Sequence, residues 1–186
     1  MNLTVKDLER LQTKLQEEHL DYQLELVDGN VIVMGPSDYV SEEIGARLIT
    51  FLASYVIPRK LGRVTGSSAG FILPNESSDL RAPDVSFVSA ERLKHSPSAF
   101  VKMVPDLMVE IKSKTDRIKP IEEKIKLFLK LGTEVGILID PDKETVTLYR
   151  PTGQPTVLTN QDILTIPELF PGWELPVSDL WPPEFE

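Results

Sequence analysis

A strand, a helix and a second strand follow one another between residues 107 and 139, and this succession limits the fold most. Leu107 to Lys112 is an apolar run of strand length, and "EVGILID" from Glu134 is another. Between them, residues 118–131 repeat apolar side chains at helical spacing. Two strands joined in this way belong to one sheet, and the helix packs back across it. The succession therefore predicts an α/β fold.

The remaining elements are expected to complete a mixed central sheet flanked by helices in a single domain, residues 1–186. In chain order they are a capped helix within residues 1–20, a hairpin around Asp28-Gly29, a helix that Ser37 caps and that ends before Pro58, and strands at 71–73, 84–88 and 145–150. The proline-rich tail, residues 153–186, is expected to be irregular. Its apolar side chains should hold it on the body of the protein or on a partner.

Composition narrows the environment of the chain. A hydrophobic content of 41% over 186 residues is enough for a substantial core. The sequence contains no cysteine, which excludes disulfides and thiolate metal sites. It also lacks the apolar core of a signal peptide and any apolar run of about 18 residues, so we expect a cytoplasmic protein.

Charge is distributed unevenly along the sequence. The net charge is −9, yet residues 92–130 hold ten Lys and Arg against five acidic residues. One interpretation is a basic surface that faces a polyanion such as nucleic acid. The alternative is an ordinary solvated helix face.

Lys124 occupies an unusual position on the predicted helix. At 100° per residue it falls between Phe128 and Leu131, on the apolar side, where it is the only charge. Burying an unpaired ammonium costs roughly several kcal/mol. A carboxylate on the sheet should therefore face it. Glu110, on the preceding strand, is the nearest candidate. Otherwise Lys124 extends to solvent at the edge of the stripe.

Three further charged groups accompany Lys124. Glu110 and Lys112 are two residues apart on a strand, so their side chains should share a face. Asp84 follows Pro83 and opens another short strand. Two carboxylates are hard oxygen ligands suited to Mg²⁺ or Mn²⁺, and a nearby lysine can stabilise charge on a phosphate. If these four groups converge, the chemistry they favour is metal-assisted hydrolysis of a phosphodiester.

Each group also has an ordinary structural interpretation. In this interpretation Asp84 caps a turn and has no role in chemistry. Glu110 and Lys112 can form a solvated pair on an exposed strand, which contributes little to stability. His19 and His95 have no ligand or nucleophile at motif spacing, so neither is a candidate.

The pattern Pro83-Asp84 followed by Glu110-Ile111-Lys112 resembles the PD-(D/E)xK motif of restriction-endonuclease-like nucleases. More specifically, the chain resembles the Uma-two family of "putative restriction endonucleases", a group abundant in cyanobacteria. The resemblance covers nearly the whole chain and rests on these blocks in this order: "LELVDGNVIVMGPSDYVSEEIGARL", "RAPDVSFVS", "PDLMVEIKSKTDR", "EEKIKLFLKLGTEVGILIDP", "TVTLYRP" and "PELFPGWELPVSDLW".

The resemblance implies a divalent metal, Mg²⁺ or Mn²⁺, at the acidic pair. It assigns Asp84 and Glu110 as metal ligands together with the backbone carbonyl of Ile111. Lys112 would be the catalytic lysine, and Lys124 matches a lysine that family members often carry on the following helix. Accessory acids are expected at Glu25 on the first strand and at Glu42 or Glu43 on an early helix, with Glu43 as our choice.

We therefore expect a Mg²⁺-dependent DNA endonuclease that works as a homodimer, because cutting both strands of a duplex needs two sites. The competing hypothesis is a catalytically silent module that keeps the nuclease fold and binds DNA or another partner. The net charge of −9 and the absence of an obvious DNA-reading helix favour that alternative.

Overall fold

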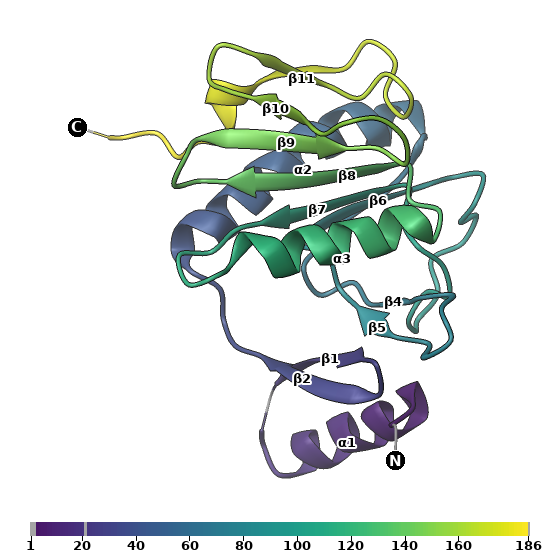
Figure 1. The fold of residues 1–186 in the computed structure, drawn as a ribbon. Helices are drawn as coiled ribbons and strands as arrows, with labels where there is room; N and C mark the ends of the chain where they lie inside the picture. Colours follow the sequence, from purple (N-terminus) through teal and green to yellow (C-terminus); the bar gives the residue numbers. More distant parts are fainter. Residues whose placement is uncertain (1–2, 21, 186) are drawn as a thin grey trace.

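The computed structural model describes residues 3–20 and 22–185, and its centre is a six-stranded sheet (Figure 1). The strand order is β10-β9-β8-β7-β6-β3. These strands are β3 (Gly62–Gly66), β6 (Val85–Ser89), β7 (Leu107–Ile111), β8 (Val135–Asp140), β9 (Thr145–Tyr149) and β10 (Thr156–Leu158). Strands β7 and β8 are parallel and the other neighbours are antiparallel. The predicted mixed α/β sheet is confirmed.

Two helices cover the two faces of this sheet. Helix α3 (Ile118–Lys130) connects β7 to β8 and crosses in front of them in Figure 1, as the strand–helix–strand pattern predicts. It buries Ile125 and Phe128 against Met108 and Leu138 of the sheet. Helix α2 (Tyr39–Arg59) packs on the opposite face.

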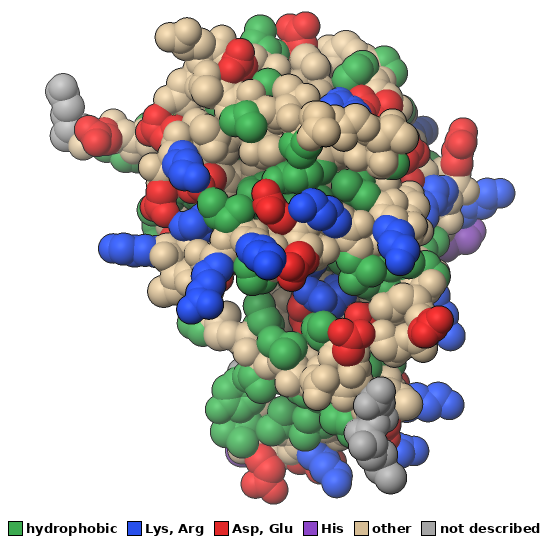
Figure 2. All heavy atoms as spheres, in the orientation of Figure 1, with side chains coloured by type: hydrophobic (Ala, Val, Ile, Leu, Met, Phe, Trp, Pro, Cys, Tyr) green, Lys and Arg blue, Asp and Glu red, His purple; other side chains and the backbone are tan. Residues whose placement is uncertain are grey.

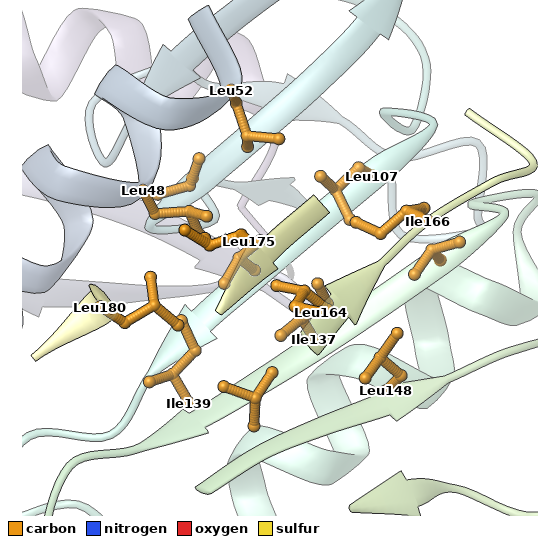
Figure 3. Close-up of a cluster of buried hydrophobic side chains, with 14 of the residues drawn as sticks. Leu48, Leu52, Leu107, Ile137, Ile139, Leu148, Leu164, Ile166, Leu175 and Leu180 are labelled. Carbon is orange, nitrogen blue, oxygen red and sulfur yellow. The ribbon is translucent and has the colours of Figure 1, made fainter. Parts of the chain in front are cut away.

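The tail is more ordered than the sequence predicts. It forms the short strands β11 (Ile163–Thr165) and β12 (Glu174–Pro176), which pair with each other, and the 3-10 helix η1 (Val177–Leu180). Its apolar side chains enter the core beside α2, where Leu164, Ile166, Leu175 and Leu180 meet Leu48 and Ile137 (Figure 3). The tail therefore covers part of the sheet face on which α2 packs.

A second sheet lies beside the central one in the order β2-β1-β5-β4. It contains β1 (Gln23–Val27), β2 (Asn30–Met34), β4 (Phe71–Ile72) and β5 (Leu80–Arg81). Helix α1 (Val5–Glu17) packs on it through Leu8, and Thr4 and Asp7 form the predicted capping box. The predicted hairpin at Asp28-Gly29 is confirmed, and both turn residues have positive φ.

The ends of α2 differ from the prediction. Asp38 rather than Ser37 is the N-cap, because its carboxylate accepts the Ser41 N–H at 3.0 Å. The helix passes Pro58 and ends at Arg59, with Lys60 in the left-handed region. A proline in the last turn removes only one backbone hydrogen bond, so the helix continues for one residue more. Among the described residues, no helix combines the length and apolar character needed to cross a membrane.

The packing of α3 depends on the absence of a side chain at Gly136. A Cβ at this position of β8 would lie 2.5 Å from Cγ2 of Ile125, which is fully buried. We expect Gly136→Ala to lower the free energy of unfolding by about 1–3 kcal/mol, because the helix must move or a buried side chain must leave its rotamer. Chemical denaturation measures the change.

Gly35→Ala is the matched control. A Cβ there meets no atom within 4 Å, so its free energy of unfolding should change by less than about 0.5 kcal/mol. Equal stability of the two variants would mean that α3 does not approach β8 this closely.

Candidate active site

Asp84 lies where the pairing of β6 with β7 ends. Val85 is opposite Val109, so continuing the register places Pro83 opposite Ile111. Proline has no N–H to donate to β7, so the ladder ends here, and the Ile111 N–H donates to Oδ2 of Asp84 at 2.6 Å. The carboxylate of Asp84 is thus held beside the main chain of Ile111. Both residues line a pocket of about 610 Å³.

Glu110 and Lys124 form a buried ion pair in the same pocket. The ammonium of Lys124 lies 2.8 Å from Oε1 and 3.0 Å from Oε2 of Glu110. It also donates to the carbonyl of Ala82 at 3.0 Å. The predicted pairing of these two side chains is confirmed, because α3 crosses β7 with its apolar face against the sheet. Lys124 does not extend to solvent at the edge of the stripe.

Glu25 joins the second sheet to this ion pair. Its carboxylate accepts the Ala82 N–H at 2.8 Å and lies 3.5 Å from the ammonium of Lys124. The Nε atom of Arg81 is 3.0 Å from the other carboxylate oxygen. Glu25 is therefore buried among two cations and a backbone donor, and it fixes the segment that leads to Asp84.

Arg81 is a pocket residue that the sequence did not single out. It lies outside the basic segment 92–130, and in sequence it is one cation in a polar loop. Only the pairing of β5 with β1 brings it beside Glu25 and into the pocket. Its position directly before Ala82-Pro83-Asp84 was the one available signal.

Burial dominates the acid–base behaviour of these groups. Loss of solvation raises the pKa of Glu110 to about 7, against the opposing charge of Lys124. Burial also raises the pKa of Asp84, although the Ile111 N–H and Lys124 act against it. For Lys124, burial favours the neutral form, but Glu110 and Glu25 outweigh it and the pKa lies above its usual value. The charge of Asp84 adds to the rise in the pKa of Glu110, and a cation bound beside both carboxylates would relieve that repulsion.

Lys112 lies apart from the other predicted groups. Strand β7 ends at Ile111, and the ammonium of Lys112 is 2.6 Å from Oδ2 of Asp142, in the turn between β8 and β9. It also donates to the carbonyl of Ser113 at 3.2 Å. Of the four groups expected to converge, Asp84, Glu110 and Lys124 line one pocket. Lys112 is held outside that lining by Asp142.

The early helix places Glu42 in the pocket, and not the chosen Glu43. Glu42 is also close enough to Asp84 to raise its pKa. On α2, Glu42 shares its face with Gly45 and Ile49, which line the adjoining cavity with it. Glu43 is one position further along, so it is turned about 100° away.

The donor set suits a divalent ion that takes few protein ligands. Within residues 3–20 and 22–185, no three His, Cys, Asp or Glu side chains are grouped closely enough to hold a metal. Asp84 and Glu110 offer two carboxylates, and Mg²⁺ is commonly held by one or two carboxylates with water in the other positions. Oε1 of Glu110 is buried and has only its ionic contact with Lys124, without a hydrogen bond. The two carboxylates therefore suit such an ion.

A family model described as "Putative restriction endonuclease", named Uma2, matches residues 5–178. The chain belongs to the Uma2 family. No curated protein matches the sequence. Among solved structures, the chain is similar to a "putative nuclease belonging to DUF820" from Anabaena variabilis, with a TM-score of 0.74 and 23% identity over 84% of this chain and 88% of that one. The family resemblance seen in the sequence is confirmed, and the solved structure shares the fold.

Removing Lys124 should destabilise this Uma2 protein, and more so at higher pH. Because the pKa of Glu110 is raised, the folded state binds its proton more tightly than the unfolded chain, so stability from this group is lost as pH rises through about 7. In Lys124→Met, Glu110 has no cation to offset its charge. We expect the free energy of unfolding to fall by roughly 3–5 kcal/mol near pH 8 and by clearly less near pH 5.

Denaturant titrations across this pH range measure the difference. Lys126→Met is the control, because Lys126 is exposed on the same helix and its nearest acid is 3.9 Å away. A loss for Lys124→Met that does not vary with pH would show that Glu110 stays ionised throughout.

Proposed function

We propose that the protein is a Mg²⁺- or Mn²⁺-dependent endonuclease that hydrolyses phosphodiester bonds of DNA at the pocket of Asp84 and Glu110. The single observation that carries the proposal is the meeting of these two carboxylates where β6 and β7 separate, with Lys124 beside Glu110. Family membership supports nuclease chemistry. We propose the divalent metal, the DNA substrate and the assignment of Asp84, Glu110 and Lys112 to a PD-(D/E)xK motif on this basis.

The proposed chemistry divides the work among a few residues. Asp84, Glu110 and the Ile111 carbonyl would hold the ion, which polarises the phosphate and lowers the pKa of a bound water. Burial raises the pKa of Glu110 and Lys124 lowers it again in part, so that more of the carboxylate is ionised and can act as a ligand near neutral pH. Glu25 holds both Lys124 and the main chain at Ala82, and so positions the segment that carries Asp84.

Two cations are candidates for contact with the substrate. Arg81 lines the pocket and presents a guanidinium, which suits the paired oxygens of a phosphate. Lys112 stays a predicted catalytic residue, and its ammonium would have to leave Asp142 to reach the pocket. Four rotatable bonds give its side chain that freedom, and a phosphate would compete with the carboxylate of Asp142.

The silent-module hypothesis has one specific observation in its favour. Lys112 is engaged by Asp142, and the described residues provide two clustered acids rather than three. A protein with this arrangement could keep the fold and bind a partner without cutting it. Cleavage assays distinguish the two hypotheses directly.

Supercoiled plasmid incubated with Mg²⁺ or Mn²⁺ should be nicked or linearised by the wild type. Asp84→Ala should lose about a hundredfold or more of the rate, because the metal loses a ligand. Lys112→Ala should lose a comparable factor if its ammonium acts on the phosphate. Asp142→Ala is the matched partner: it should not lower the rate, because it only frees Lys112.

Two outcomes would contradict the proposal. One is cleavage that survives Asp84→Ala, which would place the activity elsewhere or in a contaminant. The other is an inactive wild type whose calorimetric titration shows no Mg²⁺ or Mn²⁺ binding that depends on Asp84, which would favour the silent module.

Arg81 provides a test of DNA contact that does not need cleavage. If its guanidinium binds one phosphate, Arg81→Met should reduce the slope of log affinity against log salt by about one. Fluorescence anisotropy in Ca²⁺ or without metal measures that slope. Arg63→Met is the control, since Arg63 bonds Ser96 and Lys94 away from this pocket, and its slope should not change. Equal slopes for all three proteins would remove Arg81 from the interface.

A further inference from the structure

Strand β2 presents an unprotected apolar edge. It is the outermost strand of the second sheet and pairs with β1 on one side only. Ile32, Val33 and Met34, together with Tyr22 before β1, are between 41% and 59% exposed, and we call these four residues the hairpin patch. Figure 2 shows hydrophobic side chains gathered over the β1–β2 hairpin.

The two edge strands of the central sheet are protected in ways that β2 is not. Strand β10 has only three residues and follows Pro155, and β3 carries Arg63 and packs against α2. Short length, charge, proline and cover are the usual means of blocking an edge. Residues 29–37 contain no charge, and the strand itself contains no proline. Strand β2 therefore leaves its backbone groups open to pairing.

We propose that β2 pairs antiparallel with β2 of a second copy of this chain, so that two hairpin sheets join into one. Antiparallel pairing of a strand with itself is compatible with a two-fold axis, which is the commonest symmetry of dimers. The hairpin patch then continues across both faces of the joined sheet, with Ile32 and Met34 of each copy on one face and Val33 on the other. Each copy satisfies the free edge of the other.

Charge favours a second copy over other occupants. The protein carries −9 overall, so two copies repel over much of their surface. The uncharged segment 29–37 is a place where they can approach without a like-charge contact. DNA is a poor fit to the same strip, because phosphate contacts need Lys or Arg and this segment has neither.

The edge also adjoins the pocket. Ile32 is opposite Glu25 and Met34 is opposite Gln23, and all four line the pocket of Asp84 and Glu110. Pairing through β2 would therefore bring two pockets to one interface. The dimer itself rests on the strand edge and not on the proposed nuclease activity, so each can fail without the other.

Light scattering after size exclusion tests the assembly. The wild type should have about twice the chain mass of 20.9 kDa. Val33→Lys places two like charges at the paired edge, and we expect dimerisation to weaken by about tenfold or more. Val157→Lys is the matched control: Val157 is 58% exposed on an edge strand, as Val33 is 59% exposed on β2, and this variant should stay dimeric.

Cross-linking locates the contact without relying on a destabilising change. The chain has no cysteine, so Val33→Cys introduces a unique thiol. A two-fold axis through the paired strands keeps both thiols on one face of the joined sheet, within reach of a short bismaleimide. We expect a covalent dimer on a denaturing gel for Val33→Cys and none for Val157→Cys.

Three results would overturn the proposal. The first is a monomeric wild type over a wide range of protein concentration. The second is a dimer that Val33→Lys leaves intact, or that Val157→Lys dissociates equally. The third is equal cross-linking at the two cysteines, which would indicate random collision or aggregation.

Discussion

The ion pair of Lys124 and Glu110 connects the main parts of the molecule. Lys124 comes from the helix on one face of the central sheet, Glu110 from a central strand, and Glu25 from the second sheet. Removing three such charges from water is costly, and their attraction offsets that cost only when the geometry is good. The helix, the central sheet and the hairpin are thereby restricted to one arrangement.

The same arrangement prepares a site at a break in the sheet. Beyond the last paired residues of β6 and β7, the Ile111 N–H donates to the carboxylate of Asp84. Burial and neighbouring carboxylates raise the pKa of Asp84 and of Glu110, and the Lys124 ammonium only partly compensates. A second cation at this place would relieve the remaining repulsion. The buried carboxylates that raise the pKa values in the pocket are therefore the same groups that would bind the proposed metal ion.

The sequence predicted those features that depend on local periodicity. The helical positions of Lys124 and its neighbours indicated a buried cation, and the preceding strand supplied Glu110 as its partner. It failed where a contact depends on a distant turn. Asp142 captures Lys112 only because two parallel strands end side by side, and Arg81 enters the pocket only through pairing with the hairpin. Such contacts are set by tertiary register, which a single sequence does not encode in its spacing.

The tail has a consequence for how the molecule is made. Residues 164–180 fill the core beside α2, so the apolar face formed by α2 and the central strands is covered by a segment that is synthesised after them. Contacts over such long separations close slowly, because much chain entropy is lost before they form. The nascent protein therefore carries this face open until the covering segment has left the ribosome. During that interval the open face is a place where the unfinished chain can aggregate or bind a chaperone.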